Sequence, residues 1–265
     1  MRIPFTQVDA FASELFGGNP AAVMPLARWL PDDRLQAIAA ENNLSETAFF
    51  IPDGGDEADF ELRWFTPAVE VELCGHATLA SGHVVLQSEP ARDRVRFRTG
   101  KAGVLEVARD GIGYAMALPA YRAEPTPLPA IVAGLGLSGA VETFWHPNRY
   151  GLVVLEDEAA VRALRPDFRA LAAEGDVLTI ATAPGRGTDI VSRVFACGAG
   201  IDEDPVTGSA HSVLTPYWTQ RLGRDRFTAF QASARGGRIT CRAEGDHVIL
   251  GGQCVTVIEG TFLLP

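Results

Sequence analysis

Two stretches of the chain are apolar or small on every side of a predicted helix. They open with the similar patterns Gly75–Thr78 and Gly208–His211, and the two glycines are 133 residues apart (208 − 75), about half of the 265-residue chain. A helix that is apolar all round is normally surrounded by protein. We therefore expect helices near 77–87 and 206–221 to form the centres of two similar halves.

Short runs of β-branched and aromatic residues flank both predicted helices. Turns separate these runs, as expected for a chain with 27 glycines and 17 prolines. A helix buried on all sides cannot rest on one face of an open sheet, so the strands must curve around it. The predicted fold class is α+β, with two pseudo-symmetric halves, each a barrel-like, mostly antiparallel sheet around a central apolar helix. A doubly wound nucleotide-binding fold is disfavoured, because no GxGxxG follows the first strand.

The boundary between the halves is predicted from a cluster of prolines. Four prolines fall between residues 119 and 129, which makes this segment the best linker candidate. The predicted domains are residues 1–118 and 119–265. The last strand of the chain is left free to pack on the N-terminal half.

Charge and cysteine content narrow the class of protein. A formal net charge of −10 argues against nonspecific nucleic-acid binding, which needs a basic surface. The sequence has neither a signal peptide nor a long apolar segment, so we expect no membrane contact and a cytoplasmic location. The cysteines of the chain are widely spaced and none forms a CxxC pair. This spacing indicates reduced thiols rather than a zinc site or a disulfide scaffold. They are Cys74, Cys197, Cys241 and Cys254.

The starts of the two apolar helices are candidate anion sites. The first N–H groups of a helix have no partner within the helix, and this end carries a partial positive charge. Two such ends facing each other across a cleft would bind a carboxylate and stabilise a developing negative charge. A small carboxylic acid is therefore the expected ligand.

Glu46 is the first candidate for acid–base chemistry. It directly precedes the apolar strand expected at residues 47–51, so its carboxylate would be partly desolvated at the mouth of that strand. Desolvation makes a carboxylate a better proton shuttle near neutral pH. The alternative is an exposed glutamate at a strand end, or a cap.

Cys74 and His76 occupy the first helix start. A helix N-terminus lowers the pKa of a thiol, which favours a reactive Cys74 thiolate, whereas the alternative is a buried cysteine that acts as a small apolar residue. The helix dipole favours a neutral His76, able to bind a substrate oxygen. His83 follows one heptad later, but no carboxylate ligand lies at metal spacing, so no metal site is predicted.

Three acidic residues precede the second helix start, at 202–204. One acid would suffice as a cap, so Asp204 is a candidate to bind a polar group of the substrate. The Ser209 hydroxyl and nearby N–H groups would hold a carboxylate, whereas a serine nucleophile is disfavoured because no GxSxG surrounds it. The turn at 231–238 places Arg235 among glycines, where it either binds an anion or belongs to a solvated hairpin.

Five motifs resemble those of the PhzF-like phenazine-biosynthesis isomerase family, in the same order along nearly the whole chain. They are Gly18–Val23, Asn43–Phe49, Phe65–Glu70, Cys74–Thr78 and Asp204–Ala210. The resemblance implies the diaminopimelate epimerase-like fold, isomerisation of a small carboxylic acid by proton transfer without a cofactor, and a homodimer. It also implies that Glu46 is the proton shuttle, supported by His76, Asp204 and Ser209.

The candidate residues fall into two sets. The catalytic candidates are Glu46, His76 and Asp204. The substrate-binding candidates are Asn19, Cys74, Gly75, Ala77, Gly208, Ser209, Ala210 and Arg235.

Two other functions stay open at this stage. Cys74 matches a position where epimerases of this fold keep a catalytic cysteine, so a one-cysteine amino-acid epimerase or racemase is an alternative. The second epimerase cysteine is replaced by Asp204-Pro205, which disfavours a two-cysteine racemase. A protein that kept the cleft for binding a small ligand, without catalysis, is the third possibility.

Overall fold

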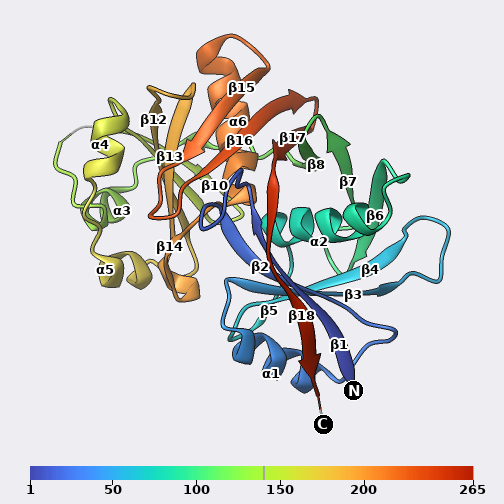
Figure 1. Cartoon of the computed structure of the whole chain (residues 1–265). Coiled ribbons are helices and arrows are strands. Elements are labelled where there is room, and N and C mark those ends of the chain that lie inside the picture. The colour runs from blue at the N-terminus through green and yellow to red at the C-terminus, as the bar shows by residue number, and fades with distance from the viewer. Residues whose placement is uncertain (140, 265) are drawn as a thin grey trace. The chain divides into compact units, whose positions relative to one another are not determined.

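A computed structural model describes residues 1–139 and 141–264 of the chain. The chain divides into two compact units (Figure 1). The first unit contains Met1–Ala117 and Gly251–Pro265, and the second contains Leu118–Leu250. Residues 251–265 belong to the first unit because the last strand pairs with the first one, antiparallel, from Ala10↔Cys254 to Arg2↔Leu263.

The first unit is a mixed sheet of nine strands with two helices. The strands β18, β1 and β2 are antiparallel, β3 joins β2 in parallel, β4 pairs antiparallel with β3, β6 joins β4 in parallel, and β7 and β8 continue antiparallel. The elements are β1 (Arg2–Ala10), β2 (Asn19–Pro25), α1 (Asp32–Asn42), β3 (Glu46–Pro52), β4 (Phe60–Phe65), β5 (Glu70–Val71), α2 (Gly75–Ser88), β6 (Arg94–Thr99), β7 (Val104–Asp110), β8 (Gly113–Pro119) and β18 (Cys254–Leu263).

The second unit repeats this strand order. Here β10 and β11 are antiparallel, β12 joins β11 in parallel, β13 is antiparallel to β12, β15 joins β13 in parallel, and β16 is antiparallel to β15. The elements are β9 (Glu124–Pro125), α3 (Pro129–Gly134), β10 (Glu142–His146), β11 (Tyr150–Val154), α4 (Glu158–Ala163), α5 (Phe168–Ala173), β12 (Leu178–Pro184), β13 (Ile190–Ala196), η1 (Cys197–Ala199), β14 (Ile201–Asp204), α6 (Gly208–Leu222), β15 (Arg226–Gln231), β16 (Gly237–Glu244) and β17 (His247–Gly252).

One long, largely buried helix occurs in each unit, and the predicted α+β architecture is confirmed. Eleven of the fourteen residues of α2 are buried, and α2 contacts β1, β2, β3, β6, β7 and β18. The sheet therefore curves around this helix. In the second unit, eight of the fifteen residues of α6 are buried, and the helix contacts β16. Helix α6 begins at Gly208 rather than at residue 206, because Thr207 is still extended (φ −117°, ψ 104°).

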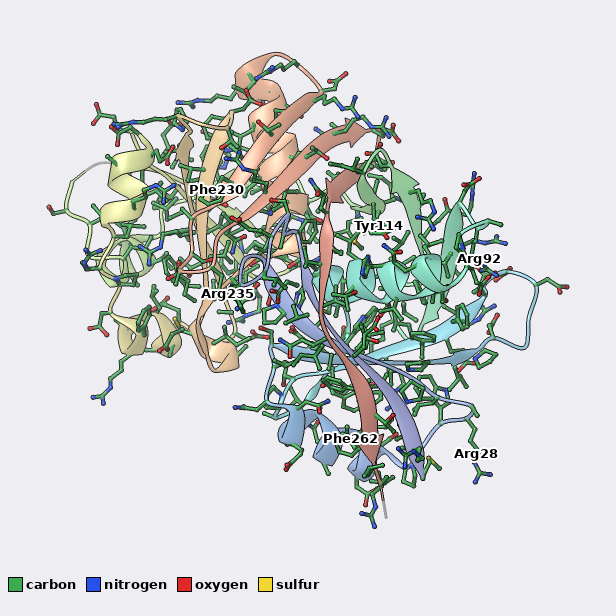
Figure 2. All side chains as sticks on the ribbon, viewed as in Figure 1. Arg28, Arg92, Tyr114, Phe230, Arg235 and Phe262 are labelled. Atoms are coloured by element: carbon green, nitrogen blue, oxygen red, sulfur yellow. The ribbon has the colours of Figure 1, made fainter. Side chains whose placement is uncertain are left out.

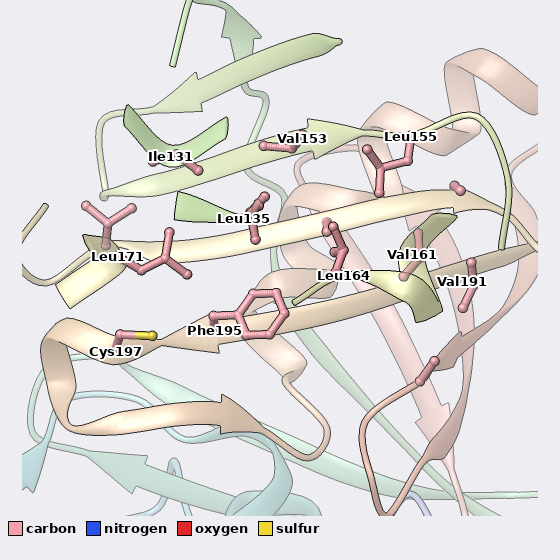
Figure 3. Close-up of a cluster of buried hydrophobic side chains, with 14 residues drawn as sticks. Ile131, Leu135, Val153, Leu155, Val161, Leu164, Leu171, Val191, Phe195 and Cys197 are labelled. Atoms are coloured by element: carbon pink, nitrogen blue, oxygen red, sulfur yellow. The ribbon is translucent and has the colours of Figure 1, made fainter. Parts of the chain in front are cut away.

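The outer faces of the sheets are covered by the shorter helices. In the first unit, α1 packs Leu35 and Ile38 into a cluster with Met24 and Phe49. In the second unit, α3, α4 and α5 supply part of a larger cluster on β11, β12 and β13 (Figure 3). A sheet covered on both faces must be apolar on both faces. The first five residues of β3 are therefore all buried, instead of alternating between buried and exposed positions.

Helix α2 is fixed within the first unit by a buried histidine. His83 lies with Nδ1 3.0 Å from the Tyr114 hydroxyl of β8 and Nε2 2.9 Å from Thr256 Oγ1 of β18. Figure 2 shows Tyr114 beside α2. These contacts join three segments that are far apart in the sequence, and they orient the helix whose N-terminus carries the first candidate residues.

Gly82 sets how closely α2 approaches β7. A Cβ at this position would lie 2.6 Å from Val107 Cβ, a β-branched side chain with little freedom to move away. We expect Gly82→Ala to lower the free energy of unfolding by about 1–3 kcal/mol through overpacking, measured by urea denaturation. Gly54→Ala is the matched control, because nothing lies within 4 Å of its added Cβ. Equal stability of the two variants would contradict the close packing of α2 on β7.

No helix in residues 1–139 and 141–264 combines the length and the hydropathy that crossing a lipid bilayer requires. The four cysteines carry free thiols.

Candidate active site

The first group of candidate residues meets at the N-terminus of α2. Cys74 is the N-cap residue, and its extended backbone (φ −139°, ψ 103°) turns the chain into the helix without a capping hydrogen bond from its side chain. Asn19 and Glu46 begin the parallel strands β2 and β3, with Ala21 of β2 paired to Glu46. Both strand starts therefore lie at the same end of the sheet, beside the helix start.

His76 is the centre of this group. Its Nε2 lies 3.0 Å from Glu46 Oε2, and on the other side of the ring Nδ1 lies 3.2 Å from Asn19 Nδ2 and 3.4 Å from Cys74 Sγ. Among the candidates from the sequence, the structure thus brings Asn19, Glu46, Cys74 and His76 into contact. Gly75 and Ala77 are buried beside them in the first turn of α2.

The Glu46–His76 pair is buried yet incompletely hydrogen-bonded. Glu46 is 9% exposed and His76 is 4% exposed. Although Glu46 Oε2 and His76 Nε2 are at ion-pair distance, neither has an aligned hydrogen bond within the described part of the chain. Buried polar atoms are nearly always hydrogen-bonded, and the exceptions are concentrated at catalytic and strained positions. The unpaired atoms of Glu46 and His76 therefore add a structural reason to keep both residues as candidates.

The charge states differ from those expected of a helix start. Burial opposes the charge of the His76 imidazole, but the interactions of the ring with Cys74 and Glu46 outweigh burial and raise the pKa of His76 well above 6.5. Burial, with the Glu46 charge, raises the pKa of the Cys74 thiol to about 11. Of the two readings of Cys74, the raised pKa favours the buried thiol over the thiolate. The neutral His76 that the helix dipole favours is opposed by the interactions of the ring with Cys74 and Glu46.

The same three side chains have the composition of a zinc site but not its arrangement. Glu46, Cys74 and His76 each offer a ligand atom, all within 4.8 Å of one another. However, the thiol lies at Nδ1 and the carboxylate lies at Nε2 of the ring. An ion bound to one nitrogen would lie away from the donor at the other nitrogen unless a side chain moved. The arrangement fits transfer and orientation of protons better than coordination of a metal.

The second group of candidates surrounds the N-terminus of α6, in the second unit. The N-cap residue Thr207 has nearly the backbone angles of Cys74. Its hydroxyl donates to Asp204 Oδ2 in a short hydrogen bond, and its N–H donates to Gln231 Oε1 at 2.9 Å. Gln231 Nε2 in turn donates to the Asp204 carbonyl at 2.7 Å. This network fixes Asp204 beside the helix start, although Asp204 is not the cap.

The same kind of side-chain contact occurs at each of the two helix starts. In α2, Thr78 Oγ1 donates to the Cys74 carbonyl at 2.6 Å, and in α6, His211 Nδ1 donates to the Thr207 carbonyl at 2.8 Å. Both bonds run back four residues to the N-cap. The sequence similarity of the two starts thus corresponds to a repeated local structure, with a histidine in place of a threonine.

The remaining candidates of the second unit lie around this start. Ser209 is half-buried in the first turn of α6, between the buried Gly208 and Ala210. Arg235 is half-buried in the turn between β15 and β16. That turn is held near the helix start because Ser233 Oγ donates to the Pro205 carbonyl at 2.8 Å and accepts from Gly236 N at 3.0 Å.

Sequence reasoning missed two residues that shape this start. Thr207 and Gln231 build the network around Asp204. The buried polar side chain that ends the apolar strand β15 was a usable signal for Gln231.

Comparison with known proteins places these residues in a family context. The sequence model of the family described as Phenazine biosynthesis-like protein (PhzC-PhzF) matches residues 8–260. The chain is similar to an uncharacterized isomerase of Pseudomonas aeruginosa (47% identity, all of both chains covered). It is also similar to a phenazine biosynthesis protein PhzF family structure from Enterococcus faecalis (43% identity, TM-score 0.91, all of both chains covered). A hydroxyproline epimerase from Agrobacterium vitis shares the fold alone (11% identity, TM-score 0.63, 98% and 92% covered).

Proposed function

Because the chain belongs to the phenazine biosynthesis-like (PhzF) family, we propose that it is a cofactor-independent isomerase that moves a proton on a small carboxylic acid. Glu46 is the proposed proton shuttle. The observation that carries this proposal is the buried Glu46–His76 pair at the N-terminus of α2. Its carboxylate lies 3.0 Å from the imidazole. The name of the Pseudomonas relative, an isomerase, supports the same reaction class.

The proposed reaction is a proton transfer without change of oxidation state. The Glu46 carboxylate takes a proton from a carbon next to an unsaturated or carboxylate-activated centre, and the electron pair of the broken C–H bond passes into that centre. The resulting Glu46 carboxylic acid returns the proton to another carbon, which restores the carboxylate. Charged His76 and the free N–H groups of α2 stabilise the negative charge that develops between the two steps.

Each other candidate has an assigned task in this proposal. Asn19 and Cys74 contact Nδ1 of His76 and orient its ring toward Glu46. Asp204 and Ser209, at the equivalent helix start of the second unit, bind polar groups of the substrate, and Arg235 adds positive charge near that start. The raised pKa of Cys74 supports a structural role for the thiol rather than a base, which disfavours the one-cysteine epimerase.

Solvent-deuterium exchange tests the reaction class directly. The protein is incubated with a panel of small carboxylic acids in deuterated water, and each acid is analysed by mass spectrometry and proton NMR. We expect at least one acid to gain a carbon-bound deuterium in the presence of the protein. Ligands that stabilise the protein against heat while none gains deuterium would instead identify a binding protein without catalysis.

A Cys74→Ser variant separates Glu46 from Cys74 as the proton-transfer group. Because the thiol is protonated at neutral pH and a hydroxyl keeps the contact with His76, we expect the exchange rate to stay within about tenfold of the wild type. The rate is measured with the acid that exchanges fastest in the screen. A loss of a thousandfold or more, with an unchanged melting temperature, would favour the epimerase alternative.

A cytoplasmic location and a homodimer belong to the same proposal. The free thiols agree with a reducing compartment, and the dimer follows from the family resemblance. Sedimentation analysis would contradict the dimer if it found only the 28.3 kDa single chain.

A further inference from the structure

The loop between β1 and β2 leads directly into the candidate active site. It covers residues 11–18 and is followed at once by Asn19, the first residue of β2. Asn19 is buried, and its Nδ2 lies 3.2 Å from His76 Nδ1. The conformation of the loop therefore decides where β2 begins and where the amide of Asn19 lies relative to the imidazole.

Three residues of this loop have a left-handed backbone conformation. The φ angles are 60° for Phe11, 71° for Phe16 and 62° for Gly18. Only glycine fits at residue 18, because a Cβ there would lie 2.2 Å from the Ala10 carbonyl oxygen. For phenylalanine this conformation is rare and unfavourable, so the loop keeps its shape only when other contacts hold it.

Hydrogen bonds of the backbone hold both ends of the loop. At its start, the N–H of Ala12 donates to the Gln253 carbonyl at 3.1 Å. At its end, the N–H of Phe16 donates to Asp9 Oδ2 at 3.1 Å. Packing contributes little at this second anchor, because Leu15 is exposed and Phe16 is 75% exposed. The Asp9 carboxylate therefore fixes the part of the loop that enters β2.

Asp9 is a buried acidic residue that the proposed reaction does not use. It is 1% exposed, and it pairs with Pro20 across the β1–β2 ladder, one position beyond Asn19. A carboxylate loses its hydration on burial, and hydrogen bonds from N–H groups compensate for that loss. A charged oxygen is also a stronger acceptor than a neutral one. The bond to Phe16 is thus suited to a loop whose backbone conformation is unfavourable.

We propose that Asp9 is a positioning residue for the acid–base pair. Through the N–H of Phe16 it fixes the β1–β2 loop, and the loop places Asn19 against the ring of His76. An amide carries both a donor and an acceptor, so Asn19 can pair with Nδ1 whether or not that nitrogen carries a proton. This inference rests on the proposed proton transfer by Glu46, whose carboxylate faces the other nitrogen of the ring.

The first test follows the His76 ring by NMR in the full-length protein, without substrate. Asp9→Ala removes the acceptor of the Phe16 N–H, and Asn19→Ala removes the contact with Nδ1. We expect both variants to shift the ring nitrogen resonances of His76 in the same direction. Unchanged resonances in Asp9→Ala would overturn the proposal.

A second substitution covers the case in which Asp9→Ala does not fold. Asp9→Asn keeps an oxygen that can accept from the Phe16 N–H, but an amide oxygen is a weaker acceptor than a carboxylate. It should therefore shift the same resonances in the same direction by a smaller amount. If Asp9→Ala is unfolded and Asp9→Asn leaves the His76 resonances unchanged, the proposal is likewise wrong.

Asp59→Ala is the matched control. Asp59 Oδ2 also accepts a backbone N–H, that of Arg96 at 2.8 Å. However, Asp59 precedes β4, which starts opposite the end of β3 that lies farthest from Glu46. The control therefore removes a comparable hydrogen bond of the first unit, and it should leave the resonances of His76 at their wild-type positions.

The second test measures deuterium exchange with the acid that exchanges fastest. Asp9→Ala is expected to lower kcat about ten- to a hundredfold, the effect of a small displacement at the reacting groups, and to leave KM unchanged. If Asp9 acts through Asn19, adding Asp9→Ala to Asn19→Ala causes little further loss of kcat. Independent losses in the double mutant, or a rise in KM at constant kcat, would contradict the positioning role.

Failure of this inference is distinguishable from failure of the isomerase proposal, because the NMR test needs no reaction. If no acid exchanges deuterium but the resonances of His76 respond to Asp9→Ala as expected, the positioning role holds and the isomerase proposal fails. If exchange requires Glu46 but neither the His76 resonances nor kcat respond to Asp9→Ala, the isomerase proposal stands and this inference fails.

Discussion

Replacing Glu46 with glutamine is expected to lower the rate of deuterium exchange by two to four powers of ten, the usual contribution of one positioned acid–base group. Glutamine keeps the size of the side chain but cannot accept a proton from carbon. Binding of the same acid, measured as a dissociation constant by isothermal calorimetry, should be retained, because the start of α6 is unchanged. The exchange rate and the dissociation constant together separate catalysis from binding.

The same variant has a second readout at His76. In the wild type the charges beside the ring hold the pKa of His76 well above 6.5. When Glu46 becomes neutral, burial dominates and the pKa of His76 should fall below that of the wild type, as followed by NMR titration of the ring protons.

Glu106→Gln is the control for this experiment. Glu106 lies on β7 of the same unit, its side chain is 39% exposed, and it forms an ion pair with the exposed Arg94. It should keep the wild-type exchange rate and the wild-type pKa of His76. If Glu46→Gln also exchanged deuterium at the wild-type rate, Glu46 would be removed from the mechanism.

Acidification from pH 6.5 to 4 is expected to destabilise the protein through His83 and His211. Burial lowers the pKa of both rings to about 4, with the charge of Arg109 adding to the effect at His83. In the unfolded chain each ring titrates near 6.5. Since the unfolded state binds more protons in this window, stability falls as pH falls, by up to about 3 kcal/mol for each histidine.

The geometry explains why the His211 ring does not accept a second proton easily. Nδ1 of His211 already donates to the Thr207 carbonyl, and Nε2 is buried without a hydrogen-bond partner in the described residues. Protonation would therefore place an unsatisfied charged N–H in the interior. His76 does not add to this loss, because its raised pKa keeps it charged in both states below pH 6.5.

Urea denaturation at several pH values between 4 and 7.5 measures the effect. His211→Asn keeps a donor for the Thr207 carbonyl but removes the titrating group, so it should reduce the pH dependence of stability by about one proton. His83→Asn should do the same. His247→Asn, at an exposed position, should change nothing, and a wild-type slope in all three variants would exclude the buried histidines as the cause.

Much of the architecture could be predicted from the sequence, because it depends on local pattern. The small-residue starts at Gly75 and Gly208 and the apolar segments that follow them indicate two buried helices, and these helices require curved sheets. The family motifs likewise identified Glu46 and His76 as candidate site residues. The family assignment and the α+β class are confirmed.

The electrostatics of the site could not be predicted in this way. The charge on His76 depends on Glu46, 30 residues earlier (76 − 46), and on burial by strands from both ends of the chain. A helix dipole is a local feature, whereas a buried counter-charge is not visible until the chain is folded. The contacts of Gln231 with Thr207 and Asp204 were hidden for the same reason, because Gln231 comes 24 positions after Thr207 and meets it only in the folded chain.

The pairing of β18 with β1 has a consequence for synthesis of the protein. The second unit is continuous in sequence, whereas the first unit is assembled from residues 1–117 and 251–265. During synthesis on the ribosome, the second unit can therefore fold before the first unit is complete. Strand β1 lacks its partner β18 until residues 254–263 have been made. Until those residues are made, the sheet that carries Glu46 and His76 lacks the strand beside β1, so the proposed chemistry depends on a segment more than 170 residues after His76 (254 − 76 = 178).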